Sequence, residues 1–251
     1  MRLPDFLIVG AARCGTTWLY ECLRRHPQVY LPPEKRPEPH FFLKNAEYER
    51  GLRYYSDRYF VGVGRDRIAG EASTSYLYHP SVAPRIAEHL PGVRLIAILR
   101  NPVDRAFSNY IVSSRNGFEP LGFSEAIRVE PERLAHPQST FEREICPFAY
   151  IDRGRYSAQL ARYLELFPGD RLHVALFDDL VAAPGETLRA AQAFLDVDPN
   201  VVPEELPPRL NAAAYDGAAI PPADRTYILD RLRDDLDALA AWLDRDLSHW
   251  T

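Results

Sequence analysis

The stretch D-F-L-I-V-G-A-A-R-C-G-T-T-W, residues 5–18, decides the fold of this chain. Its apolar run, residues 6–9, ends at Gly10, and because both faces of the run are apolar it predicts a fully buried strand. A short turn then reaches Gly15, and Thr16 opens a segment with apolar residues at helical spacing. A strand, a glycine-bounded turn and a helix form the geometry that holds phosphate, because backbone N–H groups line the turn and the helix N-terminus adds partial positive charge.

The same stretch carries the polar groups that an anion needs. Thr16 and Thr17 supply hydroxyl donors, and Arg13 supplies a planar cation with a bidentate fork. In the NTPase loop G-x-x-x-x-G-K-[ST] a lysine follows the second glycine, whereas here Thr16 stands in that place. The loop is therefore poorly suited to ATP or GTP and fits a nucleotide with a shorter 5′ anionic group. The alternative is a glycine-rich turn that binds nothing.

A second motif, L-R-N-P-V-D-R-A-F-S-N-Y, occupies residues 99–110. It follows a clear buried strand at residues 93–99, so Arg100 leaves the carboxyl end of that strand, where open α/β sheets bind ligands. A helix comes next, and Ser108 lies two turns into it. A guanidinium suits a dianionic phosphate, although Arg100 in a strand-end salt bridge is the plainer alternative.

The stretch E-P-H-F-F, residues 38–42, follows the first helix in a proline-rich segment. Proline favours extended geometry in the residue before it, and side chains two apart in an extended segment point the same way. Glu38 and His40 are therefore expected to face one side, as candidates for removing a proton from an acceptor hydroxyl. A solvated carboxylate and a structural imidazole are the alternatives. Phe41 and Phe42 are expected in the core or in a pocket wall.

Residues 10–18 resemble the 5′-phosphosulfate loop of sulfotransferases that use 3′-phosphoadenosine 5′-phosphosulfate (PAPS), and residues 99–110 resemble the 3′-phosphate motif of that family. The two motifs stand in the family's order, and the weaker resemblance runs from about residue 5 to residue 198. The E-P-H-F-F stretch is similar to the branch that contains carbohydrate (heparan-type) and bacterial sulfotransferases.

The resemblance implies a P-loop-like α/β fold, a three-layer α/β/α sandwich with a central parallel sheet. It implies PAPS as cofactor and in-line transfer of a sulfuryl group to a hydroxyl of a carbohydrate or small metabolite. It makes Glu38 the catalytic base, with His40 as the alternative base or as a donor at the transferring sulfonate. The residues expected at the cofactor are Arg13 on the leaving phosphate, the amides and hydroxyls of Cys14, Gly15, Thr16 and Thr17, Trp18 on adenine, and Arg100 and Ser108 on the 3′-phosphate.

Three positions depart from the family pattern. Arg13 stands where the family usually has lysine, and an arginine stabilises charge but is a poor proton donor. Ala72, in the expected strand at residues 67–73, replaces a residue that is often lysine there. The third departure is in residues 198–224, where the family has a basic glycine-containing loop over the cofactor and this chain has no Lys-Gly or Arg-Gly pair.

The composition is that of an ordinary globular protein. The 251 residues are 46% hydrophobic and 26% charged, which predicts a single domain over residues 1–251. A net charge of −5 argues against broad nucleic-acid binding. Three cysteines without metal-ligand spacing predict reduced thiols, a cytoplasmic location and no metal site. We also expect no signal peptide and no membrane span.

Two segments are expected to shape the site from outside the sheet. Residues 113–150 show no steady period and predict an irregular loop on the acceptor side. Residues 198–224 predict a loop that covers the cofactor. Two other classes of protein remain open from the sequence: a non-catalytic nucleotide-binding protein of the same fold, which Arg13 favours, and a P-loop kinase, which Thr16 disfavours.

Overall fold

The structure is a computed structural model that describes residues 1–33, 38–203 and 219–251. The strands are β1 (Phe6–Gly10), β2 (Val29–Tyr30), β3 (Ile68–Ala72), β4 (Arg94–Leu99) and β5 (Leu172–Leu176). The α-helices are α1 (Thr16–Leu23), α2 (Asn45–Tyr48), α3 (Gly51–Tyr59), α4 (Val82–His89), α5 (Pro102–Arg115), α6 (Phe123–Ala135), α7 (Thr140–Ile145), α8 (Tyr156–Leu164), α9 (Phe177–Ala182), α10 (Pro184–Phe194) and α11 (Pro222–Leu243). Short 3₁₀ turns are η1 (Asp152–Gly154), η2 (Gly169–Arg171) and η4 (Ser248–Trp250).

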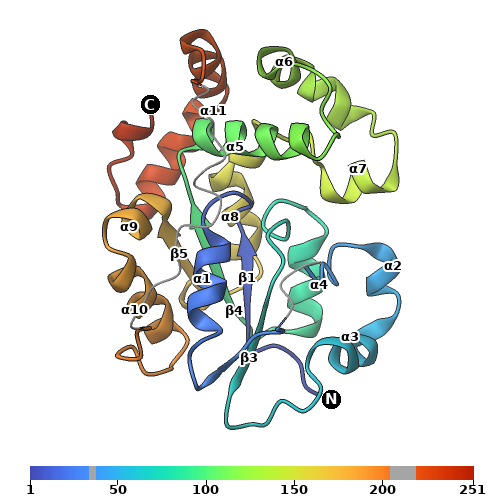
Figure 1. Cartoon of the computed structure of the whole chain (residues 1–251), viewed down its shortest axis with the longest axis vertical. Helices are drawn as coiled ribbons and strands as arrows, with labels where there is room; N and C mark the ends of the chain where they lie inside the picture. Colours follow the sequence, from blue (N-terminus) through green and yellow to red (C-terminus); the bar gives the residue numbers. More distant parts are fainter. Residues whose placement is uncertain (34–37, 204–218) are drawn as a thin grey trace. The chain divides into compact units, whose positions relative to one another are not determined.

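Five parallel strands form one sheet in the order β2-β3-β1-β4-β5 (Figure 1). β1 lies between β3 and β4, and its residues Phe6, Leu7, Ile8 and Val9 are fully buried, as their apolar run predicts. β4 is equally buried over Leu95–Leu99. The predicted α/β fold with a central parallel sheet is therefore confirmed. The strand β2 was not expected, because its two residues lie in a stretch that reads as a proline-rich loop.

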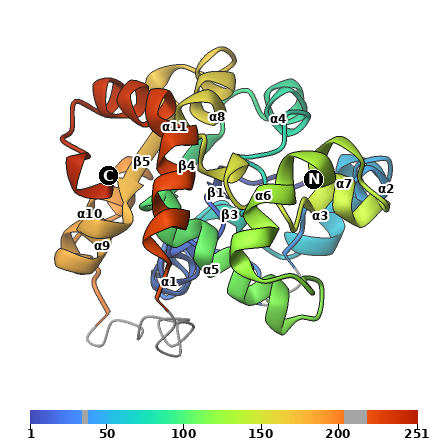
Figure 2. The ribbon, with the colours of Figure 1, turned by 90° about the horizontal axis from the view of Figure 1, so that it is seen from above.

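Helices cover both faces of the sheet. Figure 2 shows α1, α9 and α10 on one face and α4 on the other. α1 contacts α10 as well as β1, and both α9 and α10 contact β5, which completes the layer on the first face. The apolar stripe of each helix explains this packing, since α1 buries six of its eight residues and α4 buries Val82, Ala83 and Ile86.

The chain divides into two compact units. The first holds the described parts of residues 1–99 and 162–210, which include the whole sheet. The second holds the described parts of residues 100–161 and 211–251, which include α5, α6, α7 and α11. A single sulfotransferase domain over residues 1–251 stays a prediction.

The prediction of an irregular loop over residues 113–150 is wrong, because this segment contains α6 and α7. α6 buries Phe123, Ala126, Ile127 and Glu130 at helical spacing. The fourth position of that stripe is a glutamate, which hides the apolar period in the sequence. Glu130 is buried because its carboxylate accepts the backbone N–H groups of Ile151 at 2.7 Å and Asp152 at 2.8 Å.

The loop expected over residues 198–224 falls largely outside the described residues, because residues 204–218 are not described. α11 begins within this range, at Pro222. The described residues include no helix long and apolar enough to cross a membrane.

Candidate functional site

The loop between β1 and α1 depends on backbone that favours glycine. Gly15 precedes the first residue of α1 with φ 92°, and Arg13 has φ 73°. A Cβ at Gly15 would lie 3.0 Å from the ring of Phe177, so a side chain there would be both strained and crowded. This backbone turns the chain sharply before α1, and the N–H groups of the first helical turn then face the loop, as in an anion site.

Gly10 joins this loop to the segment that follows β3. A Cβ at Gly10 would lie 2.8 Å from Cβ of Leu77 and 3.1 Å from the carbonyl oxygen of Thr74. The N–H of Leu77 donates to the carbonyl of Val9 at 2.8 Å, and the N–H of Ser73 donates to that of Ile8 at 3.2 Å. The carboxyl ends of β1 and β3 are thus held in direct contact, because a glycine leaves room for the second segment.

The side chains of the loop differ in exposure. Thr16 and Trp18 are each 4% exposed and Cys14 is fully buried, whereas Arg13 and Thr17 are half-buried. The Sγ of Cys14 lies 3.7 Å from the carbonyl oxygen of Ala12, and its backbone N–H donates to the carbonyl of Ala11 at 3.2 Å, so this cysteine packs inside the turn. The stacking of Trp18 on adenine stays a prediction for a ring that packs in the first unit.

Glu38 and His40 meet as the sequence predicts. The Nε2 atom of His40 lies 3.4 Å from Oε2 of Glu38, and each side chain is 14% exposed. Glu38 accepts the backbone N–H of Thr74 at 2.9 Å and the Thr74 hydroxyl at 3.1 Å. His40 has φ 49°, so the chain turns at this residue and is not uniformly extended.

Thr74 brings the two parts of the site together in the first unit. Its backbone N–H and hydroxyl hold the carboxylate of Glu38, and its carbonyl packs against Gly10 of the phosphate loop. The two candidate catalytic residues, Glu38 and His40, therefore lie at the same edge of the sheet as the loop. Sequence reasoning missed this role of Thr74, because a residue 36 positions away in the chain makes the contact.

Glu71 is a second residue that sequence reasoning missed. It is fully buried at the end of β3, and its Oε2 accepts the hydroxyl of Ser73 at 2.9 Å. Burial raises the pKa of Glu71 to about 7, and the nearby Tyr76 and Tyr55 hydroxyls together with the hydrogen bond from Ser73 partly offset the increase. The signal that would have found it is a carboxylate inside an otherwise apolar strand that ends at the ligand-binding edge.

The aromatic residues that follow His40 in the chain, and Tyr55 of α3, lie in the core. Phe41 is 1% exposed and Phe42 fully buried, which confirms the prediction of a core position. Tyr55 of α3 is fully buried and stacks on Phe41 with ring centroids 4.3 Å apart. Ala72, in the position that often carries lysine in the family, is 2% exposed.

The 3′-phosphate motif lies in the second unit. The hydroxyl of Tyr156 donates to the backbone carbonyl of Arg100 at 2.9 Å, and Nη2 of Arg100 lies 4.0 Å from Oδ2 of Asp104. Ser108 is 2% exposed on α5. Asn101 caps α5 through its side-chain oxygen, which accepts the N–H of Val103 at 3.0 Å. The motif is therefore a helix start with an arginine held just before it.

Arg105 of the same motif is buried. The side chain is fully buried, and its guanidinium donates to the backbone carbonyls of Ala149 and Tyr150. Arg105 therefore joins α5 to the segment before η1, where a planar group with five donors can satisfy several carbonyls.

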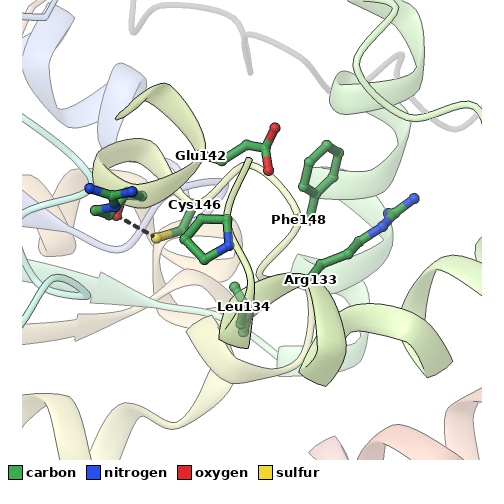
Figure 3. A pocket seen from close by; sticks show the side chains of 7 residues that line it. Arg133, Leu134, Glu142, Cys146 and Phe148 are labelled. Atoms are coloured by element: carbon green, nitrogen blue, oxygen red, sulfur yellow. Dashed lines mark hydrogen bonds between the residues drawn. The ribbon is translucent and has the colours of Figure 1, made fainter. Parts of the chain in front are cut away.

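A small cavity of about 80 Å³ lies between α6 and α7 in the second unit (Figure 3). Cys146 faces it, and its Sγ lies 3.3 Å from the carbonyl of Arg143. Ligand pockets usually measure about 300–1,000 Å³, so this cavity is too small for a nucleotide. The residues that line it are Arg133, Leu134, Pro137, Glu142, Arg143, Cys146 and Phe148.

The described residues contain no group of three or more His, Cys, Asp or Glu side chains placed to hold a metal ion. The cysteines Cys14, Cys22 and Cys146 are unbridged.

A parallel α/β sheet with a phosphate-type loop after its central strand defines the class of nucleotide-binding α/β proteins. Within that class, residues 3–215 match the family model of the sulfotransferase domain. The chain belongs to this family, whose members use PAPS. The predicted family is therefore confirmed.

Known proteins with similar chains support this assignment. The crystal structure of a sulfotransferase from Alicyclobacillus acidocaldarius has a TM-score of 0.84 and 33% identity, with 100% of this chain and 99% of that chain covered. The human bifunctional heparan sulfate N-deacetylase/N-sulfotransferase 2 is 30% identical over 79% of this chain. The human heparan sulfate glucosamine 3-O-sulfotransferase 5 is 28% identical over 80% of it. The alignments span 22% and 55% of the length of these two curated relatives.

Proposed function

We propose that this protein transfers the sulfuryl group of PAPS to a hydroxyl of a carbohydrate or small metabolite. The observation that carries the proposal is the contact at Gly10, which joins the phosphate loop to Thr74, the residue that holds Glu38. An anion site and a candidate base therefore share one edge of the sheet. Sulfuryl transfer needs both, because the leaving phosphate must be stabilised while the acceptor oxygen loses its proton.

The loop would act on the leaving 5′-phosphate. By analogy with phosphoryl transfer, the acceptor oxygen attacks sulfur in line, and the bond between sulfur and the bridging oxygen breaks. Negative charge then builds on that oxygen. Arg13 would neutralise this charge, and the N–H groups of the first turn of α1 with the hydroxyls of Thr16 and Thr17 would hold the phosphate oxygens.

Glu38 would take the proton of the acceptor hydroxyl, with His40 as the alternative base. Two donors from Thr74 fix the Glu38 carboxylate, so its free lone pairs have a defined direction. His40 lies beside Glu38, with its Nε2 atom 3.4 Å from Oε2 of the carboxylate. A base whose orientation is fixed before the acceptor binds needs little reorganisation during the reaction.

Arg100 and Ser108 would bind the 3′-phosphate of the cofactor. Support comes from the family motif that they occupy and from the Tyr156 hydroxyl, which holds the backbone of Arg100. A carbohydrate is the favoured acceptor, because curated relatives of similar sequence are named for heparan sulfate. A hydroxyl of that carbohydrate is supported by the relative that is named a 3-O-sulfotransferase. The cytoplasmic location predicted from the cysteines belongs to the same proposal.

A thermal shift with 3′,5′-adenosine bisphosphate (PAP), run beside ATP with magnesium, tests the cofactor. At one hundred times its dissociation constant a ligand stabilises by about 2.7 kcal/mol, which is a rise of about 5–10 °C for a chain of this size. We expect this rise with PAP only, and its loss in Arg100→Ala. A rise with ATP only would replace the sulfotransferase by the kinase alternative.

Transfer of label from [³⁵S]PAPS separates an enzyme from a non-catalytic binding protein. The acceptors are a heparan-type oligosaccharide, a simple sugar and a phenol. We expect label in one of the two sugars. PAP binding without transfer to any of the three would favour the non-catalytic alternative.

A further inference from the structure

Glu71 occupies a position where the fold by itself calls for an apolar residue. β3 lies between β2 and β1 in the sheet, and Glu71 pairs in register with Leu7 of β1. Its side chain is fully buried. Burying a carboxyl group costs free energy unless hydrogen bonds replace those that it makes with water. The hydrogen-bond partners of the Glu71 carboxyl therefore indicate its role.

A short hydrogen-bond chain links Glu71 to His40. The hydroxyl of Ser73 lies 2.9 Å from Oε2 of Glu71, and the backbone N–H of His40 points at the same Ser73 oxygen at 2.8 Å. A backbone N–H can only donate, so Ser73 accepts from His40 and is free to donate its own proton to Glu71. With Glu71 ionised, the direction of each bond in the chain is thereby defined.

The hydrogen bond from the His40 N–H to Ser73 constrains a residue whose backbone conformation is unfavourable. His40 has φ 49°, a left-handed conformation that is unfavourable for a residue with a side chain. Its neighbours are tied to the same segment, since Thr74 holds the Glu38 carboxylate and the Tyr76 hydroxyl accepts the N–H of Phe42 at 3.1 Å. The segment after β3 thus holds the motif of residues 38–42 at three successive points.

We propose that Glu71 is a positioning residue, which acts through the Ser73 hydroxyl to hold the backbone of His40 and so orients the Glu38–His40 pair. This inference rests on the proposed function, because it assigns Glu71 a role in orienting the candidate bases Glu38 and His40. An ionised carboxylate accepts a stronger hydrogen bond from Ser73 than a neutral acid does, and it polarises the hydroxyl toward its own donor, the His40 N–H. Ionisation of Glu71 therefore tightens the link.

The charge of Glu71 changes close to neutral pH, because burial raises its pKa to about 7. The link between Glu71 and His40 is therefore expected to strengthen as the pH rises through this value. The titratable groups that face or influence this carboxyl are Glu38, His40, Tyr20, Tyr55, Tyr59 and Tyr76.

A pH titration by NMR of the full chain without ligand tests the proposal. The signals to follow are the amide of His40 and the carboxyl carbon of Glu71 in the wild type, Glu71→Gln and Ser73→Ala. In the wild type we expect the chemical shift of the His40 amide to contain a step with the midpoint of the Glu71 carboxyl. This component should be absent in Glu71→Gln, where only a change caused by the His40 imidazole or by Glu38 can remain. In Ser73→Ala the Glu71 carboxyl should still titrate while the His40 amide no longer follows it.

Glu130→Gln is the matched control, because Glu130 is also buried with a pKa raised to about 7 but lies in the second unit. It should keep the His40 step. A His40 amide that titrates identically in the wild type and Glu71→Gln would overturn the proposal, and so would a step that survives in Ser73→Ala. Because these measurements need no cofactor, they stand apart from PAP binding, whose loss would contradict the proposed function instead.

Discussion

Arg13 is a residue on which the rate of transfer should depend strongly. Its guanidinium supplies positive charge to a loop whose other donors are neutral amides and hydroxyls. Removing one such donor to a developing anion usually costs about 10²–10³-fold in rate. We therefore expect Arg13→Ala to lower kcat for transfer from [³⁵S]PAPS by at least about 100-fold. The control Arg13→Lys keeps the charge and should retain most of the activity. A loss of under threefold in Arg13→Ala would remove Arg13 from the mechanism.

Glu38→Gln tests the base at the same scale. Glutamine preserves the size of the side chain and keeps an oxygen for the donors of Thr74, but it cannot accept a proton. General base catalysis contributes about 10²–10⁴-fold, so kcat should fall by that factor while the Kd of PAP stays within about twofold. Unchanged turnover in this variant, together with a large loss in His40→Asn, would assign the base role to His40.

At the scale of elements, the close approach at Gly10 predicts a stability effect. The Cβ of Gly10→Ala would lie 2.8 Å from Cβ of Leu77 and 3.1 Å from the carbonyl of Thr74, and neither of these atoms is the end of a flexible side chain. Overpacking of this kind costs about 1–3 kcal/mol in the free energy of unfolding. Urea denaturation measures it.

The matched control is Gly92→Ala, since a Cβ at Gly92 meets no atom within 4 Å. That variant should be neutral or more stable by up to about 1 kcal/mol. Equal stability of the two variants would show that β1 and the segment after β3 can separate at little cost. The contact that joins the phosphate loop to Glu38 would then be weak.

At the scale of the whole molecule, two buried glutamates predict how stability changes with pH. Burial raises the pKa of Glu71 and that of Glu130 to about 7, from an ordinary value of 4.5. Between these two values the folded chain binds more protons than the unfolded chain. The stabilisation is therefore complete below about pH 4.5 and is lost as the pH rises through about 7, by up to about 3 kcal/mol for each group.

Denaturation between pH 5 and pH 8 measures this loss. The free energy of unfolding of the wild type should carry a component that falls across this range, and Glu71→Gln and Glu130→Gln should each remove part of that component. A pH dependence that is the same in the wild type and in both variants would contradict the raised pKa values.

Much of the fold and part of the candidate site could be predicted from local patterns. Apolar runs identify β1 and β4, and the loop ending at Gly15 follows from its glycines and from Arg13. The contact between Glu38 and His40 was predicted from their spacing of two residues, although the left-handed φ of His40 departs from the extended segment that this prediction assumed. Local pattern fails where a polar residue occupies the core, as Glu130 does in α6, because its reason for being there is a pair of N–H groups in another segment.

The sequence by itself determined the strand–loop–helix unit, because this unit depends on neighbours close in the chain. It also determined the family and the parallel α/β sheet, through the resemblance of its short motifs. Only the tertiary structure decided that Thr74 holds Glu38, that Gly10 packs against Thr74 and that the buried Glu71 reaches His40 through Ser73. These contacts join residues more than thirty positions apart. They arise because parallel strands bring their carboxyl ends to one edge of the sheet, and no short-range pattern encodes which side chains meet there.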